Sequence, residues 1–255
     1  YSDAINNHGA VISNNSIGTN TAPNGFPCEW TGDYGVTSSL IDGVVRGDLG
    51  APMRIVWANG NERQTDRCGN LYFTTAPPAC AKNHITVGAM NSNDDTVTYF
   101  KSWGPSDDGR IKPDISAPGC QSDGDGGVTS TSSSGGYSTK CGTSMASPTA
   151  CGIGALLIQD HRNQYPDAPE MANSTLKTLL AHTAFDEGNV GPDCQYGYGS
   201  IRSKAAIDHL RGGSFLETNI AQNESYNFLI VVPAGAERFQ VTAAWDDVPA
   251  EDRKT

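Results

Sequence analysis

The sequence lacks any apolar stretch long enough to cross a bilayer. Its longest apolar runs, around residues 153–158 and 228–232, fall well short of the roughly 18 residues that a spanning helix needs. Basic residues are also scarce: 17 Lys and Arg stand against 28 Asp and Glu, which leaves a net charge of −11. The sequence has no cluster of Lys and Arg that would attract nucleic acid or an anionic membrane surface. We therefore expect no membrane span and no nucleic acid partner.

The chain is nevertheless long enough to bury a substantial core. Its 255 residues correspond to one large domain or two small ones. The 29 Gly and 14 Pro stay below the roughly 25–30% of residues that marks a low-complexity chain. We expect a compact protein with many ordered turns. Because the sequence begins at Tyr1 without Met or a signal peptide, we also expect that processing or truncation has removed its true start.

Cysteine usage favours an oxidising compartment, and hence a secreted protein. The sequence has seven cysteines but none of the C-x-x-C pairs that zinc sites favour. Cys151 lies among small residues of an apolar helix, where a buried free thiol is expected, so six cysteines remain for up to three bridges. We predict a Cys68–Cys80 bridge, because this pair flanks a short loop whose closure is worth roughly 3 kcal/mol on the chain-entropy model. The other pairings stay open, including a partner for the odd cysteine outside this sequence.

Up to residue 211, short apolar runs and stretches of helical periodicity follow one another, which is typical of a parallel sheet covered by helices. Strands are predicted at 10–12, 54–58 and 85–89, and helices at 36–48, 144–161 and 174–184. The helix at 144–161 is apolar nearly all round, which predicts a buried helix. Residues 121–140, rich in Ser, Thr and Gly, are expected to form a surface loop with a short strand inside it. The predicted fold class is α/β.

The residues after 211 differ in character. Residues 226–232 and 237–245 read as two strands of a hairpin, joined by Pro233, Ala234 and Gly235. We therefore predict that residues 212–255 begin a separate β domain. The roughly 42 residues left for it are fewer than a sandwich of about seven strands requires, so we expect the domain to be cut short at Thr255.

The strongest chemical signal is the stretch GTSMASP at residues 142–148. It places Ser144 in the first turn of a helix, where free backbone N–H groups and the positive end of the helix dipole face a developing anion. A nucleophilic serine gains from this position, because its own amide can hold a tetrahedral oxyanion. A plain N-cap would account for one hydroxyl, but not for Gly142, Pro148 and the small-residue helix that follows.

An α/β-hydrolase nucleophile elbow is the competing geometry, with Asp186 and His209 as acid and base. That elbow requires G-x-S-x-G directly after a core strand. Here Ala146 replaces the second Gly, and residues 132–141 make a poor core strand. The elbow is therefore the weaker interpretation of Ser144.

The GTSMASP stretch closely resembles the active-site serine motif of the subtilisin-like serine proteases (subtilases, peptidase family S8). Other stretches resemble segments of this family in the family's own order. They are residues 11–18 (its strand ending in Ser-x-Gly), 57–61 (its oxyanion-hole Gly-Asn), 85–89 (its VIAVGA strand), 100–119 (its FSSxGP…GRIKPDISAPG segment) and 197–206 (its GYGxxNxxxA segment). The likeness covers about residues 1–210. It implies that residues 1–211 are the C-terminal part of a subtilisin-like catalytic domain, incomplete, with a parallel sheet and flanking helices. Residues 239–249 resemble the β-sandwich domain that follows the catalytic domain in kexin-like and some bacterial alkaline subtilases.

Carried over residue by residue, the resemblance implies a serine endopeptidase. Ser144 would be the nucleophile, and Asn61 would be the side-chain donor of the oxyanion hole. Loss of such a donor typically costs roughly 3 kcal/mol of transition-state stabilisation, as in subtilisin.

The resemblance also assigns the substrate-binding residues. Ser16, Ile17 and Gly18 would pair with the substrate backbone as an added strand. The P1 pocket would be lined by Ala58, Asn59 and Gly60. Because Asn59 replaces the commoner Ala of the family, the P1 preference stays open.

Part of the family's machinery is missing from the sequence. The Asp and His of a subtilase triad precede the serine, in Asp-[Ser/Thr]-Gly and His-Gly-[Ser/Thr]-x-Val-Ala-Gly motifs, and neither motif occurs before Asn61. His8 with Gly9 is the nearest substitute, but it leads directly into the strand that ends at Ser16. We therefore expect the triad His and Asp in a missing N-terminal part of the same catalytic domain, and negligible peptidase activity from this chain alone.

The implied chemistry needs no cofactor, and no residue is predicted to bind a metal. The DGDG stretch at residues 123–126 hints at a calcium loop, but Gly127 and the lack of a Glu at the twelfth position favour a solvated loop. Structural calcium is expected only because subtilases often bind it. The expected partner is a polypeptide substrate. The alternative is a non-catalytic subtilase-like module whose groove binds peptides or a partner, although such a groove needs neither Ser144 nor Asn61.

Overall fold

A parallel sheet forms the centre of the molecule. The structure is a computed structural model that describes residues 1–65, 68, 71–123 and 126–250. The four strands lie in the order β1 (Ile12–Asn15), β2 (Arg54–Ala58), β3 (Ile85–Asn91) and β4 (Ile115–Cys120), each parallel to its neighbour. This confirms the α/β class and the strands predicted at 54–58 and 85–89. The first strand begins two residues later than the predicted 10–12.

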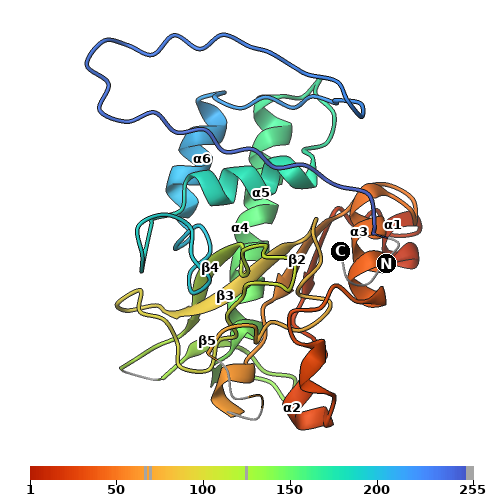
Figure 1. Cartoon of the computed structure of the whole chain (residues 1–255), viewed down its shortest axis with the longest axis vertical. Coiled ribbons are helices and arrows are strands. Elements are labelled where there is room, and N and C mark those ends of the chain that lie inside the picture. Colours follow the sequence, from red (N-terminus) through yellow and green to blue (C-terminus); the bar gives the residue numbers. More distant parts are fainter. Residues whose placement is uncertain (66–67, 69–70, 124–125, 251–255) are drawn as a thin grey trace.

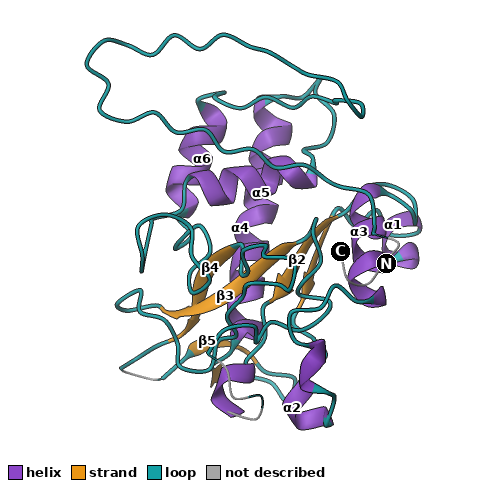
Figure 2. Cartoon of the chain, in the orientation of Figure 1, coloured by secondary structure: helices purple, strands orange, loops and turns teal. Residues whose placement is uncertain are grey.

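Helices cover both faces of this sheet (Figure 2). One face carries α4 (Thr143–Gln164), α5 (Asn173–His182) and α6 (Ser203–Arg211), and the other carries α1 (Ser2–Asn6) and α3 (Val36–Arg46). The alternation of side chains along β2 explains the two layers: Val56 packs in the core beneath α4, whereas Ile55 and Trp57 pack in the core beneath α3. The three predicted helices are confirmed, with ends that differ by up to three residues.

Helix α4 packs against all four strands of the sheet. Small residues allow this approach: Ala146 and Ala150 are fully buried, and a Cβ added to Gly154 would lie 2.9 Å from Ile12 Cδ1. The expectation that this helix is buried all round is wrong, because Leu156 on its outer side is 54% exposed. The buried side of the helix contains Leu157 and Ile158 as well as the small residues.

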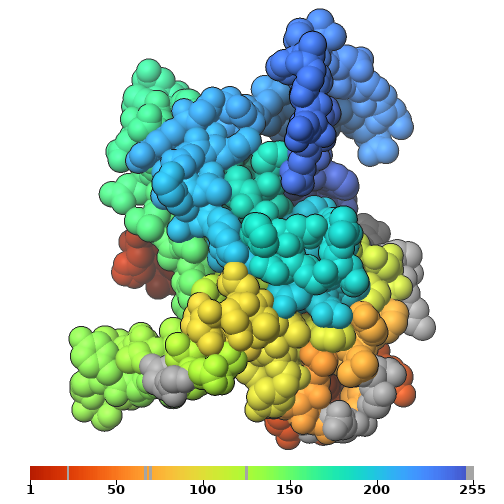
Figure 3. Space-filling model, turned by 90° about the vertical axis from the view of Figure 1, so that its left-hand side faces the viewer, coloured from red at the N-terminus to blue at the C-terminus, as the bar shows by residue number. Residues whose placement is uncertain are grey.

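The remaining elements are short and border the carboxyl ends of the strands. They are α2 (Thr21–Asn24), the 3₁₀ turns η1 (Cys28–Trp30) and η2 (Glu62–Thr65), and the antiparallel hairpin of β5 (Val128–Thr131) and β6 (Tyr137–Lys140). The hairpin projects from the body as an arm (Figure 3). The surface loop predicted at 121–140 therefore contains two strands rather than one. Residues 124–125 of the predicted acidic loop lie outside the described residues.

Residues 212–250 contain neither helix nor strand, so the two strands predicted at 226–232 and 237–245 are not formed. Their apolar side chains are exposed; Leu229, for example, is 91% exposed. An isolated two-stranded hairpin is marginal in water, and the described residues offer these two segments no further strand to pair with. A β domain beginning at residue 212 stays a prediction. Across the described residues, we find no helix with the length and apolar character needed to span a membrane.

Candidate active site

Ser144 is the second residue of α4, at the carboxyl edge of the sheet. Gly142 precedes the helix with φ 153° and ψ 161°, a backbone conformation that L side chains rarely adopt. Its N–H donates a hydrogen bond to the backbone oxygen of Gly119, near the end of β4 (2.9 Å). This turn directs the chain from the hairpin into the helix. As a first-turn residue, Ser144 has a backbone N–H with no partner within the helix, so the amide can serve an oxyanion.

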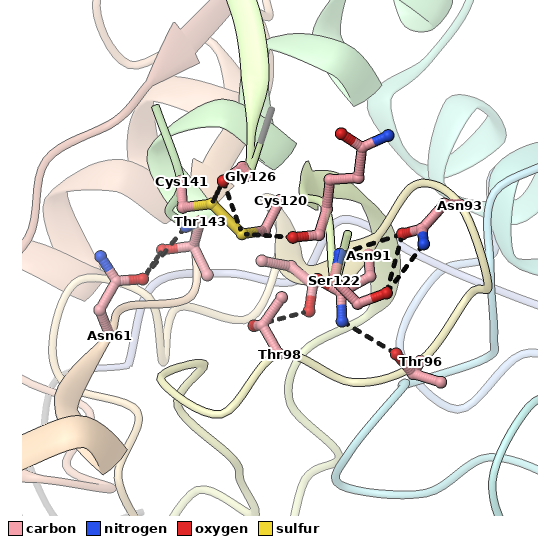
Figure 4. Close-up of a disulfide and its surroundings, with 12 residues drawn as sticks. Asn61, Asn91, Asn93, Thr96, Thr98, Cys120, Ser122, Gly126, Cys141 and Thr143 are labelled. Carbon is pink, nitrogen blue, oxygen red and sulfur yellow. Dashed lines mark hydrogen bonds between the residues drawn. A yellow bond between two sulfur atoms is a disulfide. The ribbon is translucent and has the colours of Figure 1, made fainter. Parts of the chain in front are cut away.

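Asn61 lies directly against the residue that precedes Ser144. Its Oδ1 accepts hydrogen bonds from the backbone N–H of Thr143 (3.1 Å) and from the Thr143 hydroxyl (2.9 Å), as Figure 4 shows. The same hydroxyl accepts a bond from the Gly60 N–H (3.2 Å). Asn61 Nδ2 makes no hydrogen bond to another described residue and is left as a donor. The structure thus brings together the predicted Ser144 and Asn61, 83 positions apart in the chain. Thr143 is a contributor that the sequence analysis missed, although it lies within the same motif.

The end of β1 is hydrogen-bonded to the start of α4. Ser16 Oγ donates to Ser144 O (2.9 Å), and Ser144 Oγ donates to Ser16 O over a long 3.5 Å. One turn further along the helix, the buried Ser147 donates to Asn14 Oδ1 (2.7 Å). Ser147 and Asn14 carry no role in the sequence analysis, and this pairing has no sequence signal because 133 positions separate the two residues.

A pocket of about 120 Å³ opens beside Ser144. All six predicted substrate-binding residues line it, together with others that the sequence analysis missed: Thr19, Asn20, Glu62, Ala76, Ala79 and Thr143. Segments 16–20 and 58–62 supply most of the lining of this pocket.

The side chain of Asn59 turns away from this pocket. It is 1% exposed, donates from Nδ2 to Ser102 O and accepts from Thr75 Oγ1 (3.0 Å). Ser102 holds the same loop at two further points, since its N–H donates to Gly60 O (2.9 Å) and its Oγ accepts from the Glu62 N–H (3.0 Å). Asn59 therefore contributes backbone to the pocket wall and uses its side chain to fasten the loop that carries Asn61.

Two disulfides flank the site. Cys120–Cys141 closes the base of the β5–β6 hairpin three residues before Ser144 (Figure 4). Cys28–Cys68 joins the first residue of η1 to a cysteine three positions after the end of η2. Both bridges restrict chain segments that border the pocket.

The predicted Cys68–Cys80 bridge is wrong. Cys80 is fully buried in the core, and its thiol donates to Thr75 O (3.4 Å), whereas Cys68 is bonded to Cys28. Burial raises the pKa of the Cys80 thiol to about 12. Cys151 is free, as predicted, but only partly buried; Cys80 and Cys194 are free as well. The described residues thus contain two disulfides, where up to three were expected.

No histidine of the chain hydrogen bonds to Ser144, and all five lie within the described residues. His8 Nε2 lies 3.6 Å from Asp3 Oδ2. Nε2 of the buried His84 lies 2.9 Å from the backbone oxygen of Pro78. The other three contact residues of the helical layer or the C-terminal segment: His161 faces Tyr165, and His182 and His209 face each other at 4.7 Å.

The α/β-hydrolase elbow finds no support in this geometry. Asp186 accepts from the Gly191 N–H (2.8 Å), and His209 lies 3.1 Å from Ser214 O, so neither contacts the serine. Strand β6, which precedes Ser144, belongs to the hairpin and not to the central sheet. No three His, Cys, Asp or Glu side chains among the described residues form a group suited to hold a metal ion.

The geometry agrees with a family match. Residues 1–199 match the model of the subtilase family, peptidase S8. The chain belongs to the subtilase family. Its sequence is 30% identical over 200 residues to alkaline elastase YaB of Bacillus sp. (strain YaB), covering 78% of this chain and 41% of that protein. It is 33% identical over 148 residues to serine protease AprX of Bacillus subtilis (strain 168), covering 52% of this chain and 32% of the relative. The chain thus spans less than half the length of these relatives.

The subtilase fold is also found in a solved structure, a serine-to-alanine mutant of the protease domain of PatA. It superposes with a TM-score of 0.61 at 21% identity, covering 84% of this chain and 64% of that one. At this identity the likeness supports the fold alone, with its central parallel sheet.

Proposed function

We propose that this subtilase chain is the C-terminal part of the catalytic domain of a secreted serine endopeptidase. Ser144 attacks the scissile carbonyl of a polypeptide and forms an acyl-enzyme, which water then hydrolyses. The Asn61 side chain and the Ser144 N–H hold the oxyanion. The observation that carries the proposal is the double hydrogen bond between Asn61 and Thr143, because it orients the Asn61 carboxamide beside the nucleophile.

The general base and its orienting carboxylate come from sequence outside this chain in this proposal. Ser144 Oγ has only the long contact to Ser16 O and no histidine partner among the described residues. The chain by itself is then inactive, since a serine hydroxyl without a base is a weak nucleophile. The reaction needs no cofactor; structural calcium stays a prediction from the family resemblance.

The pocket receives the substrate side chain on the acyl side of the cleaved bond, and residues 16–18 pair with the substrate backbone. Two disulfides beside the site support a secreted protein, because such bridges persist in oxidising compartments.

The test compares this chain with the gene product extended upstream to include any Asp-[Ser/Thr]-Gly and His-Gly motifs. A fluorophosphonate should label Ser144 in the extended protein, and that protein should cleave peptides; Ser144→Ala should lose both. The isolated chain should neither label nor cleave. An extended protein with both motifs that fails to label would favour a non-catalytic peptide-binding module, and robust turnover by the isolated chain would overturn the assignment of the base to another segment.

A further inference from the structure

The five residues DDVPA at 246–250 lie against the body of the fold, beside α3 and the start of α5 (Figure 1). Asp246 caps α5: its Oδ2 accepts from the Ser174 N–H (3.2 Å) and its Oδ1 from Asn173 Nδ2 (2.9 Å). Its backbone oxygen also accepts from Arg46 Nη1 (2.5 Å). A carboxylate at a helix N-terminus meets unpaired N–H groups and the positive end of the dipole, so this position suits an acidic side chain.

Asp247 is held by two neighbouring residues of the body. Asn83 pairs with its backbone in both directions, donating from Nδ2 to Asp247 O (2.7 Å) and accepting from the Asp247 N–H (2.8 Å). Lys82 Nζ forms an ion pair with the Asp247 carboxylate (2.7 Å) and donates to Val248 O (2.6 Å). The hydrogen bond from Lys82 holds the pKa of Asp247 below its ordinary value.

The residues that bind Asp247 and Ala250 are themselves held in place by hydrogen bonds to Asp42. Asp42, fully buried, accepts from the N–H of Lys82 (3.1 Å), the N–H of Asn83 (2.8 Å) and the hydroxyl of Tyr34 (2.6 Å). Tyr34 in turn accepts from the Ala250 N–H (3.3 Å). A site whose donors are fixed before the peptide arrives loses little conformational entropy on binding.

Residues 218–239, which precede this segment, make no hydrogen bonds to the described body of the fold. They hydrogen bond only among themselves, as in the bonds from Glu224 N to Ala221 O and from Ala236 N to Pro233 O. Contact with the body resumes at Gln240, whose Nε2 donates to His182 O (3.4 Å), and at Thr242, whose hydroxyl is 2.9 Å from His182 Nδ1. The C-terminal segment is therefore held mainly at its far end.

We propose that Arg46, Lys82, Asn83 and the first turn of α5 form a binding site for an Asp-Asp peptide, and that residues 246–247 of this same chain occupy it. The site anchors the C-terminal segment to the catalytic body. It lies at the amino edge of the sheet, where β3 begins, whereas Ser144 and Asn61 lie at the carboxyl edge. The proposal therefore does not depend on the proposed peptidase activity.

The test inserts a recognition sequence for a site-specific protease after Asn223 of the full chain, within residues 218–239, which make no hydrogen bond to the described body. After cleavage, the C-terminal fragment should co-elute with the body on size exclusion. Asp246→Ala combined with Asp247→Ala should weaken retention at least about tenfold, because charge-assisted bonds to fixed donors are lost. Glu224→Ala, which removes a carboxylate that among the described residues hydrogen bonds only to the neighbouring Ala221, should leave retention unchanged.

Two results would overturn the proposal: release of the fragment from the otherwise unaltered chain, and equal retention by the double variant. Elution of the uncleaved chain as a dimer that the double variant abolishes would assign the site to a second copy and overturn the intrachain occupancy. If the double variant fails to fold, reversal of the ion pair between Lys82 and Asp247 gives a second test. Lys82→Asp should release the fragment, and adding Asp247→Lys should restore its retention.

Discussion

Asn61 Oδ1 accepts two hydrogen bonds from Thr143, one from the backbone N–H and one from the hydroxyl. An amide whose oxygen is doubly occupied cannot rotate without losing both bonds, so Nδ2 keeps its direction. Thr143 also accepts from the Gly60 N–H, which ties the loop and the start of α4 into one unit. The donor of the proposed oxyanion hole is thereby oriented before substrate arrives, which is the condition under which such donors are most effective.

In the extended, active protein, Asn61→Ala should lower kcat about 10²- to 10³-fold with little change in KM, because the lost bond forms only with the oxyanion. Thr143→Val should lower kcat by about tenfold, since it removes one of the two bonds that orient Asn61. Steady-state cleavage of a chromogenic peptide measures both. Ile17→Ala, at the exposed pocket wall, serves as the control and should act mainly on KM. A normal kcat for Asn61→Ala would contradict the role of Asn61.

The meeting of Asn61 with the start of the helix at Ser144 could be predicted only through the family motifs, and these motifs gave no role to Thr143. Hydrophobic periodicity places Asn61 after a buried strand and Ser144 at the start of a helix, but says nothing of how segments about 80 positions apart approach each other. In a parallel sheet, the carboxyl ends of neighbouring strands share one edge, and the motif order supplies which loops meet there. The pairing of Asn59 with Ser102 and Thr75 has no such signal and required the structure.

The disulfides and the C-terminal segment show where sequence reasoning fails. The loop between Cys68 and Cys80 is short, but loop length ignores that Cys80 is part of the core. The alternating apolar residues at 237–245 carry a strand pattern, yet a pattern cannot form a strand without a sheet to join. Likewise Asp246 reads as one more surface acid, and only the N-terminus of α5 beside it gives this residue a partner.

Gly119 of β4 packs tightly against the turn before Ser144. A Cβ at this position would lie 2.7 Å from Gly142 O and 3.0 Å from Ala146 Cβ, two atoms held in place by the start of α4. Gly119→Ala should therefore destabilise the protein by about 1–3 kcal/mol through overpacking. Denaturant unfolding of the chain measures this change.

Gly152 of α4 provides the matched control for Gly119. A Cβ there meets nothing within 4 Å, so Gly152→Ala should stabilise the helix by up to about 1 kcal/mol. Equal effects from the two substitutions would show that the contact at Gly119 does not limit the packing of α4.

Removal of either disulfide should lower the stability of the chain. The Cys120–Cys141 bridge closes a separation of 21 residues, so replacing both cysteines by Ala should cost roughly 3 kcal/mol on the chain-entropy model. The same change at Cys28 and Cys68, separated by 40 residues, should cost slightly more. Thermal unfolding with and without reductant measures both. In each variant the sensitivity to reductant should fall, and a variant that remains as sensitive as the parent chain would contradict the pairing.

Lys101 places a cation inside the protein without an ion pair among the described residues. It is fully buried; Nζ donates to Ser116 Oγ (3.1 Å) and lies 4.6 Å from the centre of the Tyr196 ring. Burial lowers the pKa of Lys101 to about 7, with Arg63 acting in the same direction and Asp193 opposing it. Between this value and the ordinary 10.5 of lysine, the unfolded chain binds a proton that the folded chain lacks.

Stability linked to Lys101 should therefore rise with pH from about 7 to about 10.5, and should be lowest and constant below that window. Lys101→Met removes this dependence. We expect the variant to be more stable than the parent chain near neutral pH, by a margin that shrinks as the pH approaches about 10. Urea unfolding of both proteins across this range measures the margin. Lys112→Met is the contrasting control: Lys112 is paired with Asp114 (3.0 Å), so its loss should destabilise the fold. A margin for Lys101→Met that does not change with pH would show that Lys101 keeps its proton on folding.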